Sequence, residues 1–289
     1  MYDRILVPTD GSEAADAALD GAIAVAAATD ATLHVLYVAD TNQPSLARIE
    51  GEVRDVLEGE GADVVEAAAD RARRQGVEVV DDVIQGGPSR TILDYVDDRG
   101  IDLVVMGTRG QRDLERIVLG SVTGRVLRRS PVPVLAVPPE ADALVFPPER
   151  VLVGTDGSDA ADRAVREAGR IAGVSGGRVT VGTVVETGLL GFDVRSESAA
   201  AERREHTEQL VSEAADLATD AGAGSVETAV RDGDTVDELN ALADEADADL
   251  LVLGTHGRGG IDRRLLGSVT EGVVRAARRP VLSVGGPEA

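Results

Sequence analysis

One glycine-rich spacing occurs twice in the chain, and its residue types are suited to holding phosphate. The two copies are Gly107-Thr108-Arg109-Gly110 followed after nine residues by Gly120-Ser121, and Gly254-Thr255-His256-Gly257 followed after nine residues by Gly267-Ser268. Glycine lets a backbone approach a ligand closely, and the free N–H groups at a helix start attract anions. The spacing therefore predicts two phosphate loops, in which each serine hydroxyl either caps its helix or binds a phosphate oxygen.

An aspartate near the start of each copy accompanies the glycine-rich segment. Residues 4–10 recur 146 residues later, so that Asp10 matches Asp156. Each aspartate is either part of an Asp-Gly-Ser turn, with Ser12 or Ser158 as a helix cap, or a ligand-binding residue. In an open doubly wound sheet, ligands bind where strands one and four end. Those strands carry the aspartates and the glycines, which favours a binding site.

The chain is an internal repeat of two similar halves. Aligned at an offset of 147, residues 102–137 and 249–284 are identical at 18 of 36 positions. We predict a first domain over 1–138, a linker over 139–148 and a second domain over 149–289. Proline pairs bound the linker, and proline stops strand pairing and stiffens the chain.

Short runs rich in β-branched residues alternate with segments of helical period. In the first half we expect strands over 5–7, 33–38, 77–84, 103–106 and 132–137, and helices over 12–28, 46–75, 89–98 and 121–129; Gly51, Gly59 and Gly61 interrupt the second of these helices. In the second half we expect strands near 151 and over 179–185, 226–230, 250–253 and 280–284. This alternation indicates βαβ units. We predict an α/β fold with two tandem, doubly wound, Rossmann-like domains, each with a five-stranded parallel sheet in the order 3-2-1-4-5.

The composition narrows the classes of partner. The chain has 52 acidic and 29 basic residues, a net charge of −23, and all its basic residues are arginine. Such a charge repels phosphate backbones, so we expect no nucleic acid partner. The acidity indicates a solvated surface adapted to high salt, with cation binding as the alternative. No apolar run is long enough to span a membrane and no targeting segment is evident, which predicts a cytoplasmic protein.

The full pattern resembles the universal stress protein family, whose members bearing this motif bind ATP or AMP. The resemblance covers both halves and implies an adenine-nucleotide site in each. The implied residues of the first site are Pro8, Thr9, Asp10, Val38, Gly107, Gly110, Gly120, Ser121 and Val122. Those of the second site are Gly154, Thr155, Asp156, Val184, Gly254, Gly257, Arg258, Gly267, Ser268 and Val269. Asp10 and Asp156 are also candidate ligands of Mg²⁺.

The two copies differ beside the phosphate loop. After the second glycine, copy two reads Arg258-Gly259-Gly260 and copy one reads Gln111-Arg112-Asp113. A negative charge beside the loop predicts weaker binding by the first copy. The arginines Arg109, Arg112, Arg258, Arg263 and Arg264 either compensate phosphate charge or pair with carboxylates. His256 is expected to be a loop residue.

Three functions compete. The favoured one is a stress-response regulator that binds ATP or AMP. The second is a slow ATPase or phosphotransferase, for which no catalytic base is evident, and the absence of lysine excludes a Walker loop. The third is a scaffold with degenerate sites. Residues 132–137 and 280–284 are expected to pair within one chain as a pseudo-twofold dimer, and a homodimer of chains is left open.

Overall fold

The computed structural model describes residues 1–41, 46–49, 52–109, 119–141, 144–186, 197–255 and 266–285 of the 289-residue chain. The described chain divides into two compact units, and the boundary along the chain lies between Phe146 and Pro147. Unit 1 contains the first copy of the repeat and unit 2 the second.

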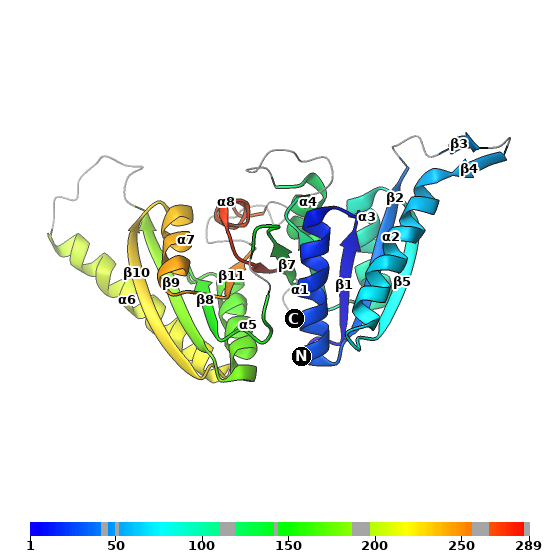
Figure 1. The fold of residues 1–289 in the computed structure, drawn as a ribbon. Coiled ribbons are helices and arrows are strands. Elements are labelled where there is room, and N and C mark those ends of the chain that lie inside the picture. The colour runs from blue at the N-terminus through cyan, green and yellow to red at the C-terminus, as the bar shows by residue number, and fades with distance from the viewer. Residues whose placement is uncertain are drawn as a thin grey trace. The chain divides into compact units, whose positions relative to one another are not determined.

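Unit 1 is built on a parallel sheet (Figure 1). Its elements are β1 (Arg4–Thr9), α1 (Glu13–Thr29), β2 (Thr32–Asp40), β3 (Leu46–Ile49), β4 (Glu52–Asp55), α2 (Val56–Arg73), β5 (Val79–Gly86), α3 (Pro88–Arg99), β6 (Leu103–Gly107), α4 (Ser121–Arg129) and β7 (Val134–Val137). The parallel strands lie in the order β5-β2-β1-β6-β7, which is 3-2-1-4-5 when the β3–β4 hairpin is left out. Helices α1 and α2 cover one face and α3 and α4 the other (Figure 1).

Unit 2 repeats this arrangement. Its elements are β8 (Arg150–Gly154), α5 (Asp159–Ser175), β9 (Arg178–Glu186), α6 (Glu197–Asp220), β10 (Ser225–Gly233), α7 (Thr235–Glu245), β11 (Leu250–Gly254), α8 (Ser268–Ala276) and β12 (Val281–Val284). The strand order is β10-β9-β8-β11-β12, and all four pairings are parallel. The predicted α/β class with parallel sheets is confirmed in both units.

Small aliphatic residues make the core of each unit. The central strands are apolar on both faces because helices cover both sides of a parallel sheet. Ile5, Leu6 and Val7 of β1 are fully buried, and Leu152 and Val153 of β8 match them. The helices facing these strands are rich in alanine, which lets them lie close to the sheet.

One expected helix is wrong at its beginning. The sequence predicted a helix over 46–75, but the structure has an antiparallel hairpin of β3 and β4 before α2 begins at Val56. The hairpin projects beyond the carboxyl end of β2 (Figure 1). Ile49 and Val53 are β-branched and flank Gly51, and both residue types weaken a helix and suit a hairpin. Gly59 and Gly61 do not interrupt the helix but lie within it.

The start of the central strand is held by the same hydrogen bonds in both units. The carboxylate of Asp102 accepts hydrogen bonds from the backbone N–H of Asp3 and Arg4. Asp249 accepts from the N–H of Glu149 and Arg150 in unit 2. These two aspartates begin the repeated segment of highest identity and fix the strands that carry the predicted site residues.

Candidate functional site

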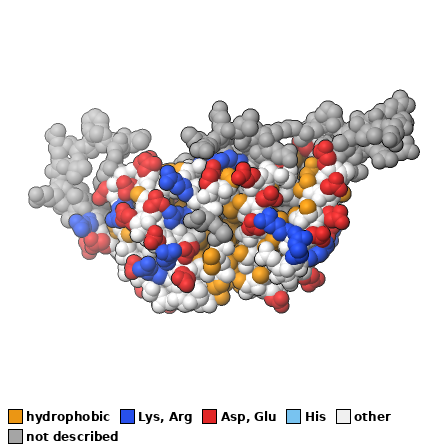
Figure 2. Space-filling model, viewed as in Figure 1, with side chains coloured by type: hydrophobic (Ala, Val, Ile, Leu, Met, Phe, Trp, Pro, Cys, Tyr) orange, Lys and Arg blue, Asp and Glu red, His pale blue; other side chains and the backbone are white. Residues whose placement is uncertain are grey.

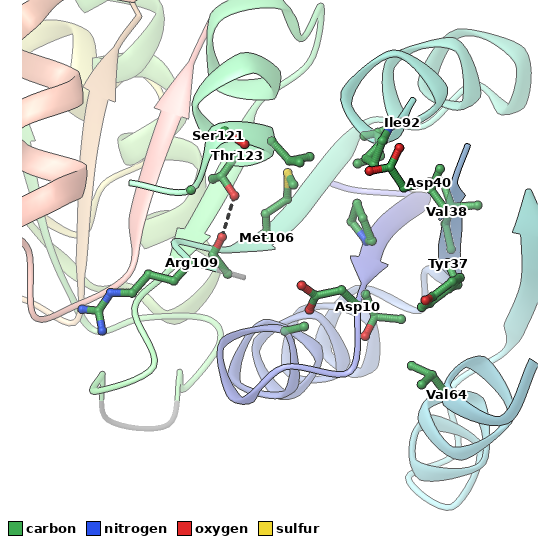
Figure 3. A pocket seen from close by; sticks show the side chains of 18 of the residues that line it. Asp10, Tyr37, Val38, Asp40, Val64, Ile92, Met106, Arg109, Ser121 and Thr123 are labelled. Carbon is green, nitrogen blue, oxygen red and sulfur yellow. Dashed lines mark hydrogen bonds between the residues drawn. The ribbon is translucent and has the colours of Figure 1, made fainter. Parts of the chain in front are cut away.

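A cavity of about 400 Å³ opens at the carboxyl ends of β1, β2 and β6 in unit 1. Its lining comes from seven elements and the loops between them: Pro8, Thr9, Asp10, Ala15, Leu36, Tyr37, Val38, Asp40, Glu60, Val64, Pro88, Ile92, Met106, Gly107, Arg109, Gly120, Ser121, Val122 and Thr123. Figure 3 shows Asp10, Tyr37 and Val64 along one side and Ile92, Met106 and Ser121 along the other. The volume lies within the range of small-molecule sites, and the position is the switch point of the sheet.

The turn after β1 holds the Asp10 side chain. Its Oδ1 accepts a hydrogen bond of 3.0 Å from the backbone N–H of Ser12, and the Ser12 hydroxyl caps α1 by accepting from the N–H of Ala15 at 3.2 Å. The predicted Asp-Gly-Ser turn is therefore confirmed, and this turn places the Asp10 carboxylate on the cavity wall. A local role and a ligand-binding role are compatible here.

The loop after β6 brings a helix start to the opposite wall. Gly107 packs so closely on α1 that an added Cβ would lie 2.5 Å from the carbonyl oxygen of Ala14. The Thr123 hydroxyl donates to the carbonyl oxygen of Gly107 at 2.8 Å (Figure 3). The backbone N–H of Gly120 donates to the carbonyl oxygen of Thr108, also at 2.8 Å. These bonds fix the first turn of α4 against the end of β6.

Gly120, not Ser121, is the N-cap of α4, and no side chain caps this helix end. The capping interpretation of the Ser121 hydroxyl is therefore wrong. Ser121 is the first helical residue, is exposed, and lines the cavity. The N–H groups of a first helical turn have no partner within their helix, so this turn offers donors and a partial positive charge to an anion.

Unit 2 has the same frame around its glycines. The Thr270 hydroxyl donates to the carbonyl oxygen of Gly254 at 2.7 Å. The backbone N–H of Gly267 donates to the carbonyl oxygen of Thr255 at 2.8 Å. Gly267 is the N-cap of α8, and Ser268 is its first, exposed residue. The capping interpretation of Ser268 is wrong for the same reason as in unit 1.

A family model now accounts for this repeated architecture. The model described as the universal stress protein family matches residues 1–138 and 148–285. The chain belongs to the universal stress protein family. Each of the two universal stress protein units of the chain thus corresponds to one match.

Individual relatives agree with this assignment. A universal stress protein of Methanocaldococcus jannaschii is 34% identical over 140 residues, which are 47% of this chain and 82% of the relative. One from Mycobacterium tuberculosis is 39% identical over 137 residues, 46% of this chain and 94% of the relative. The crystal structure of a universal stress protein from Archaeoglobus fulgidus covers 99% of this chain and 97% of its own, with a TM-score of 0.72 and 24% identity. That last similarity shows the fold.

The first universal stress protein unit brings most of its predicted site residues together. Eight of them line the cavity: Pro8, Thr9, Asp10, Val38, Gly107, Gly120, Ser121 and Val122. Gly110 lies outside the described residues, as do Arg112, Gly257, Arg258, Arg263, Arg264 and His256. Arg109 is described and pairs with Glu140, as one of its two interpretations required.

The second universal stress protein unit differs in its described part. Its described cavity, of about 430 Å³, lies mainly between α5 and α6 and includes Thr155 of the predicted site. Gly154 is buried, and an added Cβ would lie 2.7 Å from Leu253, so it serves close packing. Asp156 is exposed and accepts from the N–H of Ser158, as Asp10 does from Ser12. Val184 and Val269 occupy the places of Val38 and Val122 in the repeat.

Tyr37 is the main residue of the cavity that sequence reasoning missed. It meets α2 at Gly61, where an added Cβ would lie 2.5 Å from the Tyr37 ring. Burial, followed by the charges of Glu60 and Asp10, raises the pKa of its hydroxyl and keeps it protonated. In the repeat, Thr183 and Thr207 replace Tyr37 and Gly61, so the large and small partners change together. A lone tyrosine in a strand facing a helical glycine was the available signal.

A partly buried polar cluster links β2 and β5 to α3 as a brace. The Tyr95 hydroxyl donates to Asp82 at 2.7 Å and lies 3.0 Å from Nδ1 of His34, and Arg99 pairs with Asp82 at 3.2 Å. The Arg99 guanidinium also lies 5.2 Å from the Tyr95 ring centre. Tyr95 and Ile92 stand one turn apart on α3, so the brace positions a cavity-lining helix.

The described residues offer neither a cluster of metal ligands nor a membrane-spanning helix. Within them, no three His, Asp or Glu side chains gather as metal ligands, and Mg²⁺ at Asp10 or Asp156 stays a prediction. No described helix is long and apolar enough to cross a membrane.

Proposed function

We propose that this universal stress protein binds an adenine nucleotide, ATP or AMP, in the cavity of unit 1 and at the matching place in unit 2. It does so as a regulatory module of a stress response. The observation that carries the proposal is the cavity itself, whose lining combines the first turn of α4 with apolar side chains, one tyrosine and three carboxylates. The resemblance to nucleotide-binding members of the family supports the choice of ligand.

The two ends of the cavity suit the two ends of a nucleotide. Val38, Val64, Ile92 and Met106 offer an apolar surface for a base, and the Tyr37 ring adds an aromatic face. Asp10 is an acceptor for ribose hydroxyls or the adenine amino group. The backbone N–H groups of Ser121 and Val122 are donors for phosphate oxygens, where the helix dipole also favours negative charge.

A charge placed at the first residue of each helix tests this function. Ser121→Glu puts a carboxylate where phosphate would bind, while an acidic residue in the first turn favours the helix itself. We expect ATP affinity at unit 1 to fall at least about tenfold, since repulsion replaces charge-assisted hydrogen bonds. Ser268→Glu is expected to do the same at unit 2.

Calorimetric titration of the whole chain gives the readout. The wild-type chain is expected to bind two nucleotides, the tighter one in unit 2 because of its Arg258-Gly259-Gly260 loop. Ser121→Ala and Ser268→Ala are the controls; they keep the backbone N–H donors and add no charge, so both sites should remain, with a smaller loss of affinity than the glutamate variants show. Two unchanged sites in the double Ser121→Glu/Ser268→Glu chain would refute the proposal, and turnover of bound ATP would favour the enzyme alternative.

A further inference from the structure

We propose that Glu140 sets the phosphate preference of unit 1. By holding the Arg109 guanidinium away from the cavity, Glu140 makes unit 1 favour an adenine nucleoside or its monophosphate over the triphosphate. The inference rests on the proposed function of the same cavity and specifies which class of adenine ligand unit 1 prefers.

Arg109 is the basic residue among the described side chains that line the cavity. Its two terminal nitrogens donate to the two carboxylate oxygens of Glu140, at 2.9 and 3.1 Å. Figure 3 shows the guanidinium turned away from Asp10 and Tyr37. Two parallel bonds between planar groups are the strongest form of this pair, and they occupy the donors that a phosphate would use.

The pair is placed where it holds its geometry. The Arg109 side chain is only 18% exposed, whereas Glu140 is 52% exposed. Partly buried pairs are screened by salt less than surface pairs are. Glu140 lies three residues after the end of β7, and β7 pairs in parallel with β6, the strand that precedes Arg109.

The other described charged side chains of the cavity wall are all acidic, which makes the pairing of Arg109 matter for phosphate binding. The described lining contains the carboxylates of Asp10, Asp40 and Glu60, against the single guanidinium of Arg109. With that guanidinium shared with Glu140, each added phosphate enters a wall of negative formal charge. The first turn of α4 can still hold one phosphate through its N–H groups.

The second copy of the repeat differs at the positions of the pair. At an offset of 147, His256 replaces Arg109 and Pro287 replaces Glu140. The arginine is therefore replaced in the second copy, whereas a glutamate, Glu288, follows one residue after Pro287. Because His256 takes the place of the arginine, we expect an arginine–carboxylate pair of this kind in unit 1 and not in unit 2, and therefore different phosphate preferences in the two units.

Glu140→Gln tests the inference in a chain whose second site is closed by Ser268→Glu. Glutamine keeps the shape of the side chain and removes its charge, which frees Arg109 to turn toward a phosphate. Adenosine, AMP and ATP are titrated separately by calorimetry. The affinity for ATP is expected to rise about tenfold and that for AMP less, while that for adenosine stays unchanged.

Two further variants separate this route from a general charge effect. Glu78→Gln removes the same charge just before β5 begins, at the amino end of the sheet, and should leave all three affinities unchanged. Arg109→Gln should abolish the effect of Glu140→Gln, because the effect passes through the guanidinium.

The outcomes distinguish the inference from the function beneath it. If Glu140→Gln leaves the ratio of ATP to adenosine affinity unchanged while the nucleotides still bind, the inference is overturned and the proposed function stands. An effect of Glu140→Gln that persists in the Arg109→Gln chain also overturns it. If none of the three ligands binds the Ser268→Glu chain, the proposed function of unit 1 fails, and the inference fails with it.

Discussion

At the scale of single residues, the contact between Tyr37 and Gly61 shapes one wall of the cavity. Gly61 is buried within α2, a position where alanine would ordinarily favour the helix by about 0.5–1 kcal/mol. Its hydrogen instead makes room for the Tyr37 ring, which an added methyl would meet at 2.5 Å. The glycine is thus required by the tyrosine and not by the helix.

Gly61→Ala and Gly59→Ala form a matched pair of tests. Gly59 lies two residues earlier on the same helix, is exposed, and has open space around an added Cβ. We expect Gly59→Ala to stabilise unit 1 by about 0.5–1 kcal/mol and to leave nucleotide binding unchanged. Gly61→Ala should displace the Tyr37 ring, give no gain in the stability of unit 1 and weaken nucleotide binding at unit 1 severalfold.

Unfolding of unit 1 can be followed alone. All three tyrosines, Tyr2, Tyr37 and Tyr95, belong to unit 1 and the chain has no tryptophan, so urea unfolding by tyrosine fluorescence reports that unit. Equal gains in stability from the two alanine substitutions would show that Gly61 has no packing role.

The sequence predicted those site residues that belong to a local pattern. Asp10, Gly107, Gly120 and Ser121 lie in short motifs that a repeat makes visible, and all line the cavity. Tyr37, Glu60 and Val64 carry no such pattern, because their place in the site depends on α2 packing against β2. The Ser121 hydroxyl was ambiguous because a helix boundary uncertain by one residue changes a cap into a first-turn residue.

At the scale of elements, the brace between β2 and α3 couples the fold to pH. Burial, followed by the charge of Arg99, lowers the pKa of His34 and outweighs the opposing effect of Asp82. An unfolded histidine has a pKa of about 6.5. Below that pH the unfolded chain takes up a proton that folded His34 resists, so His34 costs stability as the pH falls.

His34→Gln tests this coupling. Glutamine can still bond to the Tyr95 hydroxyl but does not titrate. The loss of unfolding free energy of unit 1 between pH 7 and pH 5 should be smaller in His34→Gln than in the wild type, measured by urea unfolding at each pH. A wild-type loss equal to that of the variant would show that His34 is protonated equally in both states.

The elements also show where reading the sequence stops. Alternation of strands and helices predicted the α/β class because each period depends on neighbouring residues. The β3–β4 hairpin was missed because the apolar spacing of 46–55 also fits one helical face, and only the pairing of Arg48 with Val53 and its neighbours separates the two. The predicted order of strands followed from the fold class and not from any single residue.

At the scale of the whole chain, the net charge of −23 is the dominant property. Arginine side chains lie beside acidic ones on the drawn faces of both units (Figure 2), which reduces local repulsion but leaves the excess. Salt screens what remains, and the Debye length falls to about 3 Å at 1 M. The melting temperature is therefore expected to rise between dilute buffer and molar potassium chloride, and a flat or falling profile in calorimetry would exclude adaptation to high salt.

The central claim is that both units of this universal stress protein hold adenine nucleotides at the ends of their central strands. Mass spectrometry of small molecules released from the purified chain, after incubation with a mixture of nucleotides and removal of the excess, tests it most directly. The account predicts an adenine nucleotide from the wild-type chain and its loss from the Ser121→Glu/Ser268→Glu chain. Release of a different class of molecule, or equal retention of the adenine nucleotide by both chains, would contradict it.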